Sequence, residues 1–395
     1  MRRREFLKYG GALATFTAAS TSLPSLLVAK TATDPADIPT GNDADFDLEI
    51  VDVDVELIDG SIVPMYAFAH TGKKPSIPGP ILRVRQGDTV RIDIRNSSSR
   101  SHGFQILGQN NASISGLKPR NEDGEDTERI EFVATKPGTY FYVDGDNSPI
   151  NRVLGLHGAL IVEPTDGYAD GKARKKPMPY PPAAAPANIK ALFGALGEAT
   201  IGGKPARFPG KAWRPGREYV WIFNQIDPVL CRRIAAGENL SASEFQEQFH
   251  PRYFTINGLC GIDSAHDRAT CPTGRVGEPA LLRTMNAGLA THSPHIHGNH
   301  VFVLTQSNAK GVPMYQEDVY EHDVWLMPPM MIRDVLLPFT TPPDLPPAPW
   351  KMVQEKYPLR YPMHCHNEIS QTSAGGSYPM GLVTDWHIEG PLETS

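Results

Sequence analysis

Two short stretches in the last third of the chain concentrate side chains that bind transition metals. The first, HSPHIHGNH, runs from His292 to His300, and the second, MHCH, ends at His366 and is followed by Met380. A single histidine is more often structural than a ligand, but these two motifs hold six of the 13 histidines in the chain. Imidazole with thiolate suits copper or zinc, and imidazole alone suits copper, zinc or iron. The motifs therefore predict a metal site.

The spacing inside each motif predicts how the ligands converge. Side chains alternate between the two faces of a β-strand, so both histidines of a His-x-His pair point the same way. Two such pairs on neighbouring strands would bring four imidazoles to one point. These four are His295, His297, His364 and His366.

The segments that must position these residues are typical of β-strands. From Asp47 onward, apolar and polar residues alternate with period two in DLEIVDVDVELI, TVRIDIRN and GTYFYV, and Gly, Pro and Asn separate the runs. Several such strands at this spacing indicate an antiparallel sandwich or barrel. We predict an all-β chain with two Greek-key β-sandwich domains, at 46–165 and 216–390, joined by a Pro/Ala-rich linker at 166–215.

The net charge and the N-terminal residues indicate which partners and which cellular compartment to expect. The net charge of -6 gives no reason to expect nucleic acid or an anionic membrane as a partner. Residues 1–32 predict an export signal too short and too polar to span a membrane, and Arg3-Arg4-Glu5-Phe6-Leu7-Lys8 looks like the twin-arginine motif. We therefore expect a periplasmic or otherwise extracytoplasmic protein, exported by the twin-arginine pathway, without a membrane span after signal removal.

The four cysteines are compatible with disulfides in such a compartment. Cys260 and Cys271 bracket a loop that a disulfide could close, and Cys231 could pair with either of them. Spacing alone does not choose between these pairings. Cys365 lies between two histidines and is expected to be the unpaired one.

From about residue 46 onward the chain resembles the multicopper oxidase family, whose domains have the cupredoxin fold. In the first domain the resemblance rests on PGPILRVRQGDTVRIDIRN (78–96), GTYFY (138–142) and GLHGALIVEP (155–164). In the second domain it rests on YFTINGL, HSPHIHGNHVFVL and MHCH. The resemblance implies cupredoxin-like sandwiches, a copper-dependent oxidoreductase, and a small-molecule reductant or oxygen as partner.

Position within the family pattern implies a role for each ligand. His292 would be a histidine of a blue-copper site, and Cys365 would be its thiolate. The second domain's half of a three-copper cluster, where oxygen is reduced, would be His295, His297, His364 and His366. The first domain should supply the other half through two His-x-His pairs, but Arg100 and Val143–Gly145 stand there. Only His102 remains, and we expect it to reach across to the cluster.

The implied blue-copper site also lacks a ligand. The family places a second histidine five residues after the cysteine, where this chain has Ser370; an alignment on Gly381 places Ser377 there instead. Such a site needs two histidines and one cysteine around the metal, and neither Met380 nor Leu382 can replace an equatorial imidazole. We therefore expect fewer than four copper ions per chain and no intense blue colour.

Three functions agree with this reduced set of ligands. The first is an exported copper oxidoreductase, the second is metal binding or storage without catalysis, and the third is a copper-free structural protein of the same fold. A zinc hydrolase would also suit clustered imidazoles with an open position, although the family resemblance argues against it. The substrate, the electron partner and the oligomeric state stay open, with a homotrimer as one arrangement.

Overall fold

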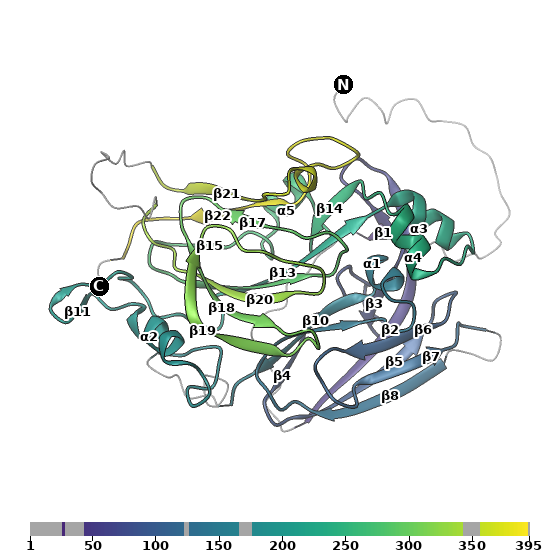
Figure 1. The fold of residues 1–395 in the computed structure, drawn as a ribbon, viewed down its shortest axis with the longest axis horizontal. Coiled ribbons are helices and arrows are strands. Elements are labelled where there is room, and N and C mark those ends of the chain that lie inside the picture. The colour runs from purple at the N-terminus through teal and green to yellow at the C-terminus, as the bar shows by residue number, and fades with distance from the viewer. Residues whose placement is uncertain (1–25, 28–42, 122–125, 166–175, 343–355, 394–395) are drawn as a thin grey trace.

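The computed structural model describes residues 26–27, 43–121, 126–165, 176–342 and 356–393 (Figure 1). Apart from Leu26–Leu27, the expected export signal at 1–32 lies outside the described residues. Within the described ranges, none of the helices is both long enough and apolar enough to cross a membrane.

The first β-sandwich is built from two five-stranded sheets that share one apolar core. In one sheet the strand order is β1 (Leu26–Leu27), β2 (Asp43–Glu56), β5 (Thr89–Asn96) and β8 (Asp126–Val133), with β3 (Ile62–His70) paired to β2. In the other it is β4 (Leu82–Arg85), β10 (His157–Glu163), β9 (Gly138–Val143), β6 (His102–Ile106) and β7 (Ser113–Leu117). The alternating burial along β5 reproduces the period-two pattern of its sequence.

The second β-sandwich carries the metal-ligand motifs. Its larger sheet has the order β14 (Tyr253–Ile256), β13 (Glu218–Ile226), β16 (Ala280–Asn286), β20 (Ile332–Leu337), β18 (Val301–Ser307) and β19 (Pro313–His322). Its smaller sheet has the order β15 (Thr273–Gly274), β22 (Val383–Ile388), β21 (Leu359–Cys365) and β17 (Pro294–Ile296). The predicted class, all-β with two sandwiches, is confirmed.

The strand pattern indicated antiparallel sheets, but the sheets are mixed and contain parallel pairs as well. Greek-key connections place β2 beside β5, β4 beside β10, and β13 beside β16 as parallel pairs. Strand alternation reports which residues face the core, but it does not report the direction of the neighbouring strand.

The two sandwiches are joined through a buried interface. Phe141 and Ile161 of the first sandwich share an apolar cluster with Ile222 and Met285 of the second. Arg83 of β4 contacts Glu218 of β13 at 3.2 Å, within a group of buried charges that spans the interface. This interface explains why β10 and β16 are buried on both faces.

Short helices and small strands lie between and around the sheets. They are α1 (Ile150–Val153), α2 (Ala187–Ala195), β11 (Thr200–Ile201), β12 (Lys204–Pro205), α3 (Pro228–Ala235), α4 (Ala242–Gln248), α5 (Gly261–His266) and the 3-10 helix η3 (Glu368–Gln371). Helix α2 packs with Trp213 and Phe302 in a separate cluster, so this described part of the expected linker lies against the second sandwich. Helices α3 and α4 instead contribute Leu230 and Phe245 to the core of the first sandwich.

All four cysteines are free and buried, so none of the pairings left open by the sequence is formed. Cys231 lies in the first core on α3, whereas Cys260 precedes α5 and Cys271 follows it. Burial raises the pKa of each of these three thiols to about 12, so they stay protonated and unreactive at neutral pH.

The stability of the folded chain is expected to fall below pH 6.5 because of His157. This side chain is buried at the start of β10, where its Nδ1 donates to the carbonyl of Arg152 at 2.7 Å. Burial lowers the pKa of His157 from 6.5 to about 4. The unfolded chain therefore binds a proton that the folded chain excludes between these values, and about 3 kcal/mol of stability is lost on going from pH 7 to pH 4.

Urea unfolding measured across that pH range checks this expectation. A His157→Gln variant keeps an amide that can donate to Arg152, and it should show a shallower loss of stability with falling pH. Equal slopes for the two proteins would remove His157 from the explanation.

Candidate metal centre

The four histidines of the two motifs meet on the smaller sheet of the second sandwich. Strand β17 pairs with β21 so that His295 lies opposite His364, and the amide of His297 donates to Pro362 while that of His366 donates to Ser293. The His-x-His pairs therefore lie side by side with their rings on one face, as their spacing predicts. His297 and His366 are exposed, and His295 and His364 are half-buried.

The rings are close enough for several nitrogens to bind one ion. The Nε2 atoms of His297 and His364 lie 3.1 Å apart, and one ligand atom each from His295, His297 and His364 all fall within 4.8 Å of one another. The His366 ring is adjacent, with its centroid 4.4 Å from that of His295. Imidazole nitrogens bound to one ion at about 2 Å each lie roughly 3 Å apart, so the set fits a metal ion. It is the only such group of three among the described residues.

Hydrogen bonds at the opposite ring nitrogens orient two of these imidazoles. The Nδ1 of His295 lies 3.0 Å from the carbonyl oxygen of Asp323, and the Nδ1 of His364 lies 3.4 Å from that of Cys365. An N–H at Nδ1 leaves the lone pair on Nε2, which is the usual arrangement of a metal-binding histidine. Burial, and then the neighbouring imidazoles, lower the pKa of His297, so it is neutral and able to bind metal at neutral pH.

His292 and Cys365 meet beneath this cluster, as the family pattern implies. Both side chains are completely buried, and the Nδ1 of His292 lies 3.6 Å from the sulfur of Cys365. The sulfur accepts hydrogen bonds from the backbone N–H groups of Ser293 at 3.3 Å and Asn367 at 3.4 Å. Burial raises the pKa of Cys365, and these two bonds partly offset that effect.

The third position beside this pair holds Ser370. Its side chain is fully buried in η3, and its Oγ has no hydrogen-bond partner among the described residues. The hydroxyl is close enough to Cys365 to lower the pKa of the thiol, against the larger effect of burial. The alternative, Ser377, lies exposed in a turn with Ser373. Met380, which cannot replace an imidazole, lies beside Gly261 of α5. Glu368, at the start of η3, is exposed. The His292–Cys365 pair therefore has a hydroxyl where the family has an imidazole.

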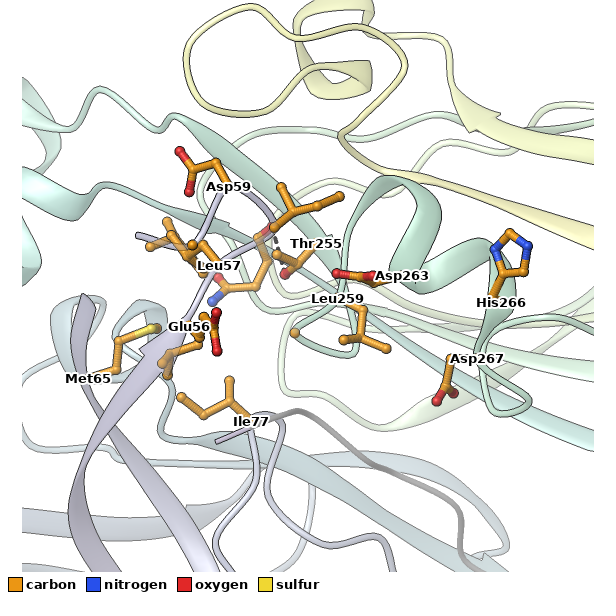
Figure 2. Close-up of a pocket in the computed structure, with 16 residues that line it drawn as sticks. Glu56, Leu57, Asp59, Met65, Ile77, Thr255, Leu259, Asp263, His266 and Asp267 are labelled. Atoms are coloured by element: carbon orange, nitrogen blue, oxygen red, sulfur yellow. Dashed lines mark hydrogen bonds between the residues drawn. The ribbon is translucent and has the colours of Figure 1, made fainter. Parts of the chain in front are cut away.

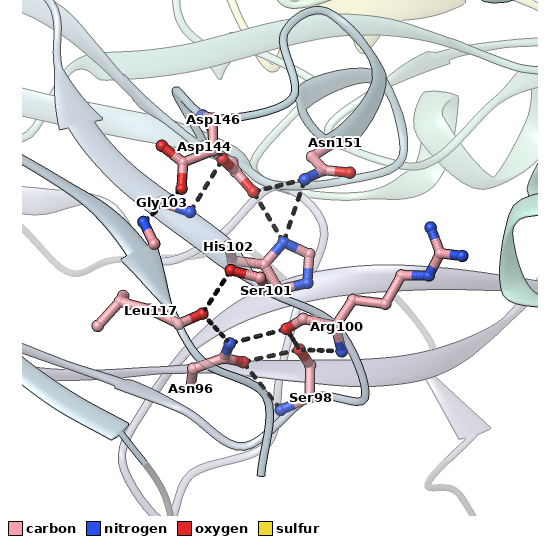
Figure 3. A network of polar contacts seen from close by, with 11 residues as sticks. Asn96, Ser98, Arg100, Ser101, His102, Gly103, Leu117, Asp144, Asp146 and Asn151 are labelled. Atoms are coloured by element: carbon pink, nitrogen blue, oxygen red, sulfur yellow. Dashed lines mark hydrogen bonds and ion pairs between the residues drawn. The ribbon is translucent and has the colours of Figure 1, made fainter. Parts of the chain in front are cut away.

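His102 is not brought to the four-histidine cluster. It is completely buried in the first sandwich, where its ring contacts that of Tyr66. Its Nδ1 donates to Asp144 and lies 3.2 Å from the amide nitrogen of Asn151 (Figure 3). Its Nδ1 lies 2.7 Å from a carboxylate oxygen of Asp144, which also accepts a 2.7 Å bond from the amide of Asn151. Arg100 is likewise turned away, because its guanidinium binds Asn239 and Glu238 in the α3–α4 segment.

This network occupies the same structural position as the His292–Cys365 pair. In the second sandwich His292 lies two residues before Pro294, the strand partner of Cys365. In the first, His102 lies two residues before Phe104, and the register that pairs Gln105 with Val143 brings Phe104 opposite Asp144 when it is extended by one residue. In both sandwiches two backbone N–H groups donate to the acceptor, Asp144 or Cys365. One belongs to the residue directly after the histidine, and the other to the residue two positions after the acceptor. In the first sandwich these donors are Gly103 at 3.0 Å and Asp146 at 2.8 Å. The two domains therefore hold equivalent sites, one with a carboxylate and one with a thiol.

Sequence reasoning missed Asp144 and Asn151, because it compared the first domain only with the three-copper motifs. Asp144 directly follows β9, just as Cys365 ends β21, and this shared place at a strand end was the available signal. Asn151 lies on α1, and no sequence pattern links it to His102.

A groove of about 390 Å³ borders the four-histidine cluster. His297 and His364 lie on its wall together with Ile262, Tyr378 and Met380. Ile262 and Tyr378 are large and exposed, so the surface next to the imidazoles is apolar and accessible.

Comparison with known proteins agrees with these features. The family model described as "Multicopper oxidase" matches residues 70–167. A copper-containing nitrite reductase from Alcaligenes faecalis is 30% identical over 122 residues, which is 30% of this chain and 31% of that protein. Copper resistance protein A from Escherichia coli is 32% identical over 92 residues, or 22% of this chain and 15% of that protein. The match thus spans less than a third of either curated relative.

Solved structures show that the fold likeness extends over most of the chain. The blue copper oxidase from Nitrosomonas europaea has a TM-score of 0.59 at 20% identity, covering 88% of this chain and 86% of that one. A copper nitrite reductase from the same organism has a TM-score of 0.53 at 18% identity, covering 87% and 93%. At these identities the likeness shows the fold.

Proposed function

We propose that this chain is a divergent member of the multicopper oxidase family and acts as an exported copper-binding oxidoreductase with a reduced copper complement. The copper would be held by the second-domain histidines His295, His297, His364 and His366. The observation that carries the proposal is the 3.1 Å approach of the His297 and His364 Nε2 atoms, next to a third imidazole held by Asp323.

The chemistry of the donors supports copper at this site. Imidazole nitrogens are good ligands for copper, and the copper proteins among its relatives make copper a better candidate than zinc. Bound copper would supply one-electron chemistry and an open coordination position for oxygen or a small reductant. The chain itself orients the Nε2 lone pairs, keeps His297 neutral, and leaves two of the four rings exposed to small molecules.

Metal binding without turnover is the second candidate. The observation that favours it is the absence of a complete blue-copper ligand set at either equivalent position of the described chain. The second sandwich has His292 and Cys365 with Ser370, and the first has His102 with Asp144 in place of a thiolate. Without such a site, electrons would have to reach the cluster directly from a reductant in the adjacent groove.

Three further statements belong to the proposal. The domains would extend over 46–165 and 216–390, with 166–215 as linker. Export would follow the twin-arginine pathway into the periplasm or another extracytoplasmic space. The oligomeric state is open, and a homotrimer is one arrangement to test by the mass in solution.

Metal analysis and electron paramagnetic resonance of the copper-loaded protein test the proposal. We expect fewer than four copper ions per chain and no blue-copper signal. The His295→Ala/His364→Ala double variant removes two of the four donors and should weaken copper binding by at least about 100-fold. His250→Ala, which removes an exposed histidine elsewhere, is the matched control and should leave copper binding unchanged.

The possible outcomes separate the candidates. Unchanged copper content in the double variant would contradict the site and favour a structural protein. Copper bound at the cluster without consumption of oxygen in the presence of a reductant would favour metal binding alone.

A further inference from the structure

A cleft of about 620 Å³ lies between the two sandwiches and shares no lining residue with the four-histidine cluster. One wall is formed by the end of β2 and the turn after it, and the other by β14 and α5 (Figure 2). The volume is that of a pocket for a small molecule. We call it the interdomain cleft, and its polar lining residues are Glu56, Asp59, Asn224, Thr255, Asp263, His266 and Asp267.

Negative charge stands on both walls of this cleft. Glu56 and Asp59 come from the first sandwich, and Asp263 and Asp267 come from α5 and the residue after it. Figure 2 shows the two groups on opposite sides of the opening. The described lining residues include no lysine or arginine, so within this lining no fixed cation balances the four carboxylates.

A buried acceptor completes the cleft. Asn224 lies on β13 and is 2% exposed, and its amide nitrogen donates to the carbonyl of Val153 at 2.9 Å. Its Oδ1 has no hydrogen-bond partner among the described residues, although Asn224 lines the cleft. A buried carbonyl oxygen without a partner is costly, so this position favours a ligand that brings an N–H donor.

The remaining lining is apolar. Leu57, Ile77 and Leu259 contribute hydrocarbon surface between the charged walls. A ligand that matches the whole lining therefore has positive charge toward both walls, an N–H donor for Asn224, and methylene groups in the middle.

We propose that the interdomain cleft binds a small aliphatic diamine in its doubly protonated form. One ammonium group would pair with Glu56, and the other with Asp263 and Asp267. The hydrocarbon chain between them would lie on Leu57 and Leu259, and an N–H would donate to Asn224.

A metal ion fits this cleft less well than an organic dication. Among the described residues, no three carboxylate or histidine ligands of the cleft come close enough to share one ion, since the only such group lies at His295, His297 and His364. Asp59 is also engaged already, because its carboxylate accepts bonds from Tyr253 and Ser61. Opposed charges at a distance suit a ligand with two separated cationic ends.

Calorimetric titration of the full chain with 1,4-diaminobutane tests the proposal, with butylamine and magnesium chloride as comparison ligands. We expect saturable binding of the diamine that weakens with added salt, and binding of butylamine that is about tenfold weaker or more. The Glu56→Gln/Asp263→Asn double variant keeps the shape of both side chains and removes one charge from each wall. It should bind the diamine about tenfold more weakly than the parent.

The Glu317→Gln/Asp318→Asn variant is the matched control, because it removes two exposed carboxylates from β19 and changes the net charge equally. It should bind the diamine as the parent does. Equal weakening in both variants, absence of diamine binding, or tighter binding of magnesium would each overturn the proposal. Copper content is measured in parallel, so a failure here is separable from a failure of the histidine site.

Discussion

A Ser370→His variant is expected to acquire an intense blue charge-transfer band on addition of copper, which the parent protein should lack. The variant places a second imidazole beside His292 and Cys365, whose nitrogen and sulfur atoms already lie 3.6 Å apart. Two histidines and one cysteine form the trigonal set of a blue-copper site. The two backbone N–H groups that donate to the sulfur of Cys365 are already in place to stabilise a thiolate.

Absorption and electron paramagnetic resonance spectra of the copper-loaded variant provide the measurement. Ser377→His is the matched control, because it adds a histidine at the exposed alternative position and should give no blue band. Adding Cys365→Ser to Ser370→His should abolish the band. A Ser370→His protein that folds and binds copper but stays colourless would contradict the position assigned to Ser370.

Replacing Arg283 with methionine is expected to destabilise the protein by about 3–5 kcal/mol. Arg283 is buried at the interface between the sandwiches, where it contacts Glu218 at 3.0 Å and Asp334 at 3.1 Å. It also donates to the hydroxyl of Thr139 in the first sandwich at 3.0 Å. Removing the cation leaves the buried carboxylates of Glu218 and Asp334 with less positive charge beside them. This lowers the free energy of unfolding far more than the loss of an exposed ion pair does.

Denaturant unfolding measures this effect. Arg129→Met is the control, because it makes the same substitution at an arginine whose 2.6 Å ion pair with Asp93 is solvent-exposed. The loss of stability in this variant should stay below about 1 kcal/mol. If the two variants lost similar stability, the buried network would not hold the interface as described.

The sequence allowed the strands and the four-histidine face to be predicted, because both depend on local alternation. His295 and His297 share a face through the period of the strand, and His364 and His366 do so for the same reason. Pairing β17 with β21 then followed from one assumption, that the two motifs lie on neighbouring strands. The register His295 opposite His364 bears this out.

Features that depend on distant parts of the chain could not be predicted in this way. The place of His102 is set by Asp144 and Asn151, which lie more than forty residues away and carry no metal-ligand signature. Arg100 was expected near the metal, but its partners are on the α3–α4 segment, about 138 residues away. The interdomain cleft likewise exists only where the turn after β2 approaches α5.

The equivalence of the two buried pairs has a consequence for the history of the chain. Each domain keeps the same pair of backbone amides around one acceptor, and the acceptor itself has changed. This is the outcome expected of a duplicated ancestral unit whose copies diverged separately. In the first copy the acceptor is a carboxylate next to a histidine, and in the second it is a sulfur next to a histidine and a serine hydroxyl. The same arrangement of backbone amides therefore serves two different acceptors.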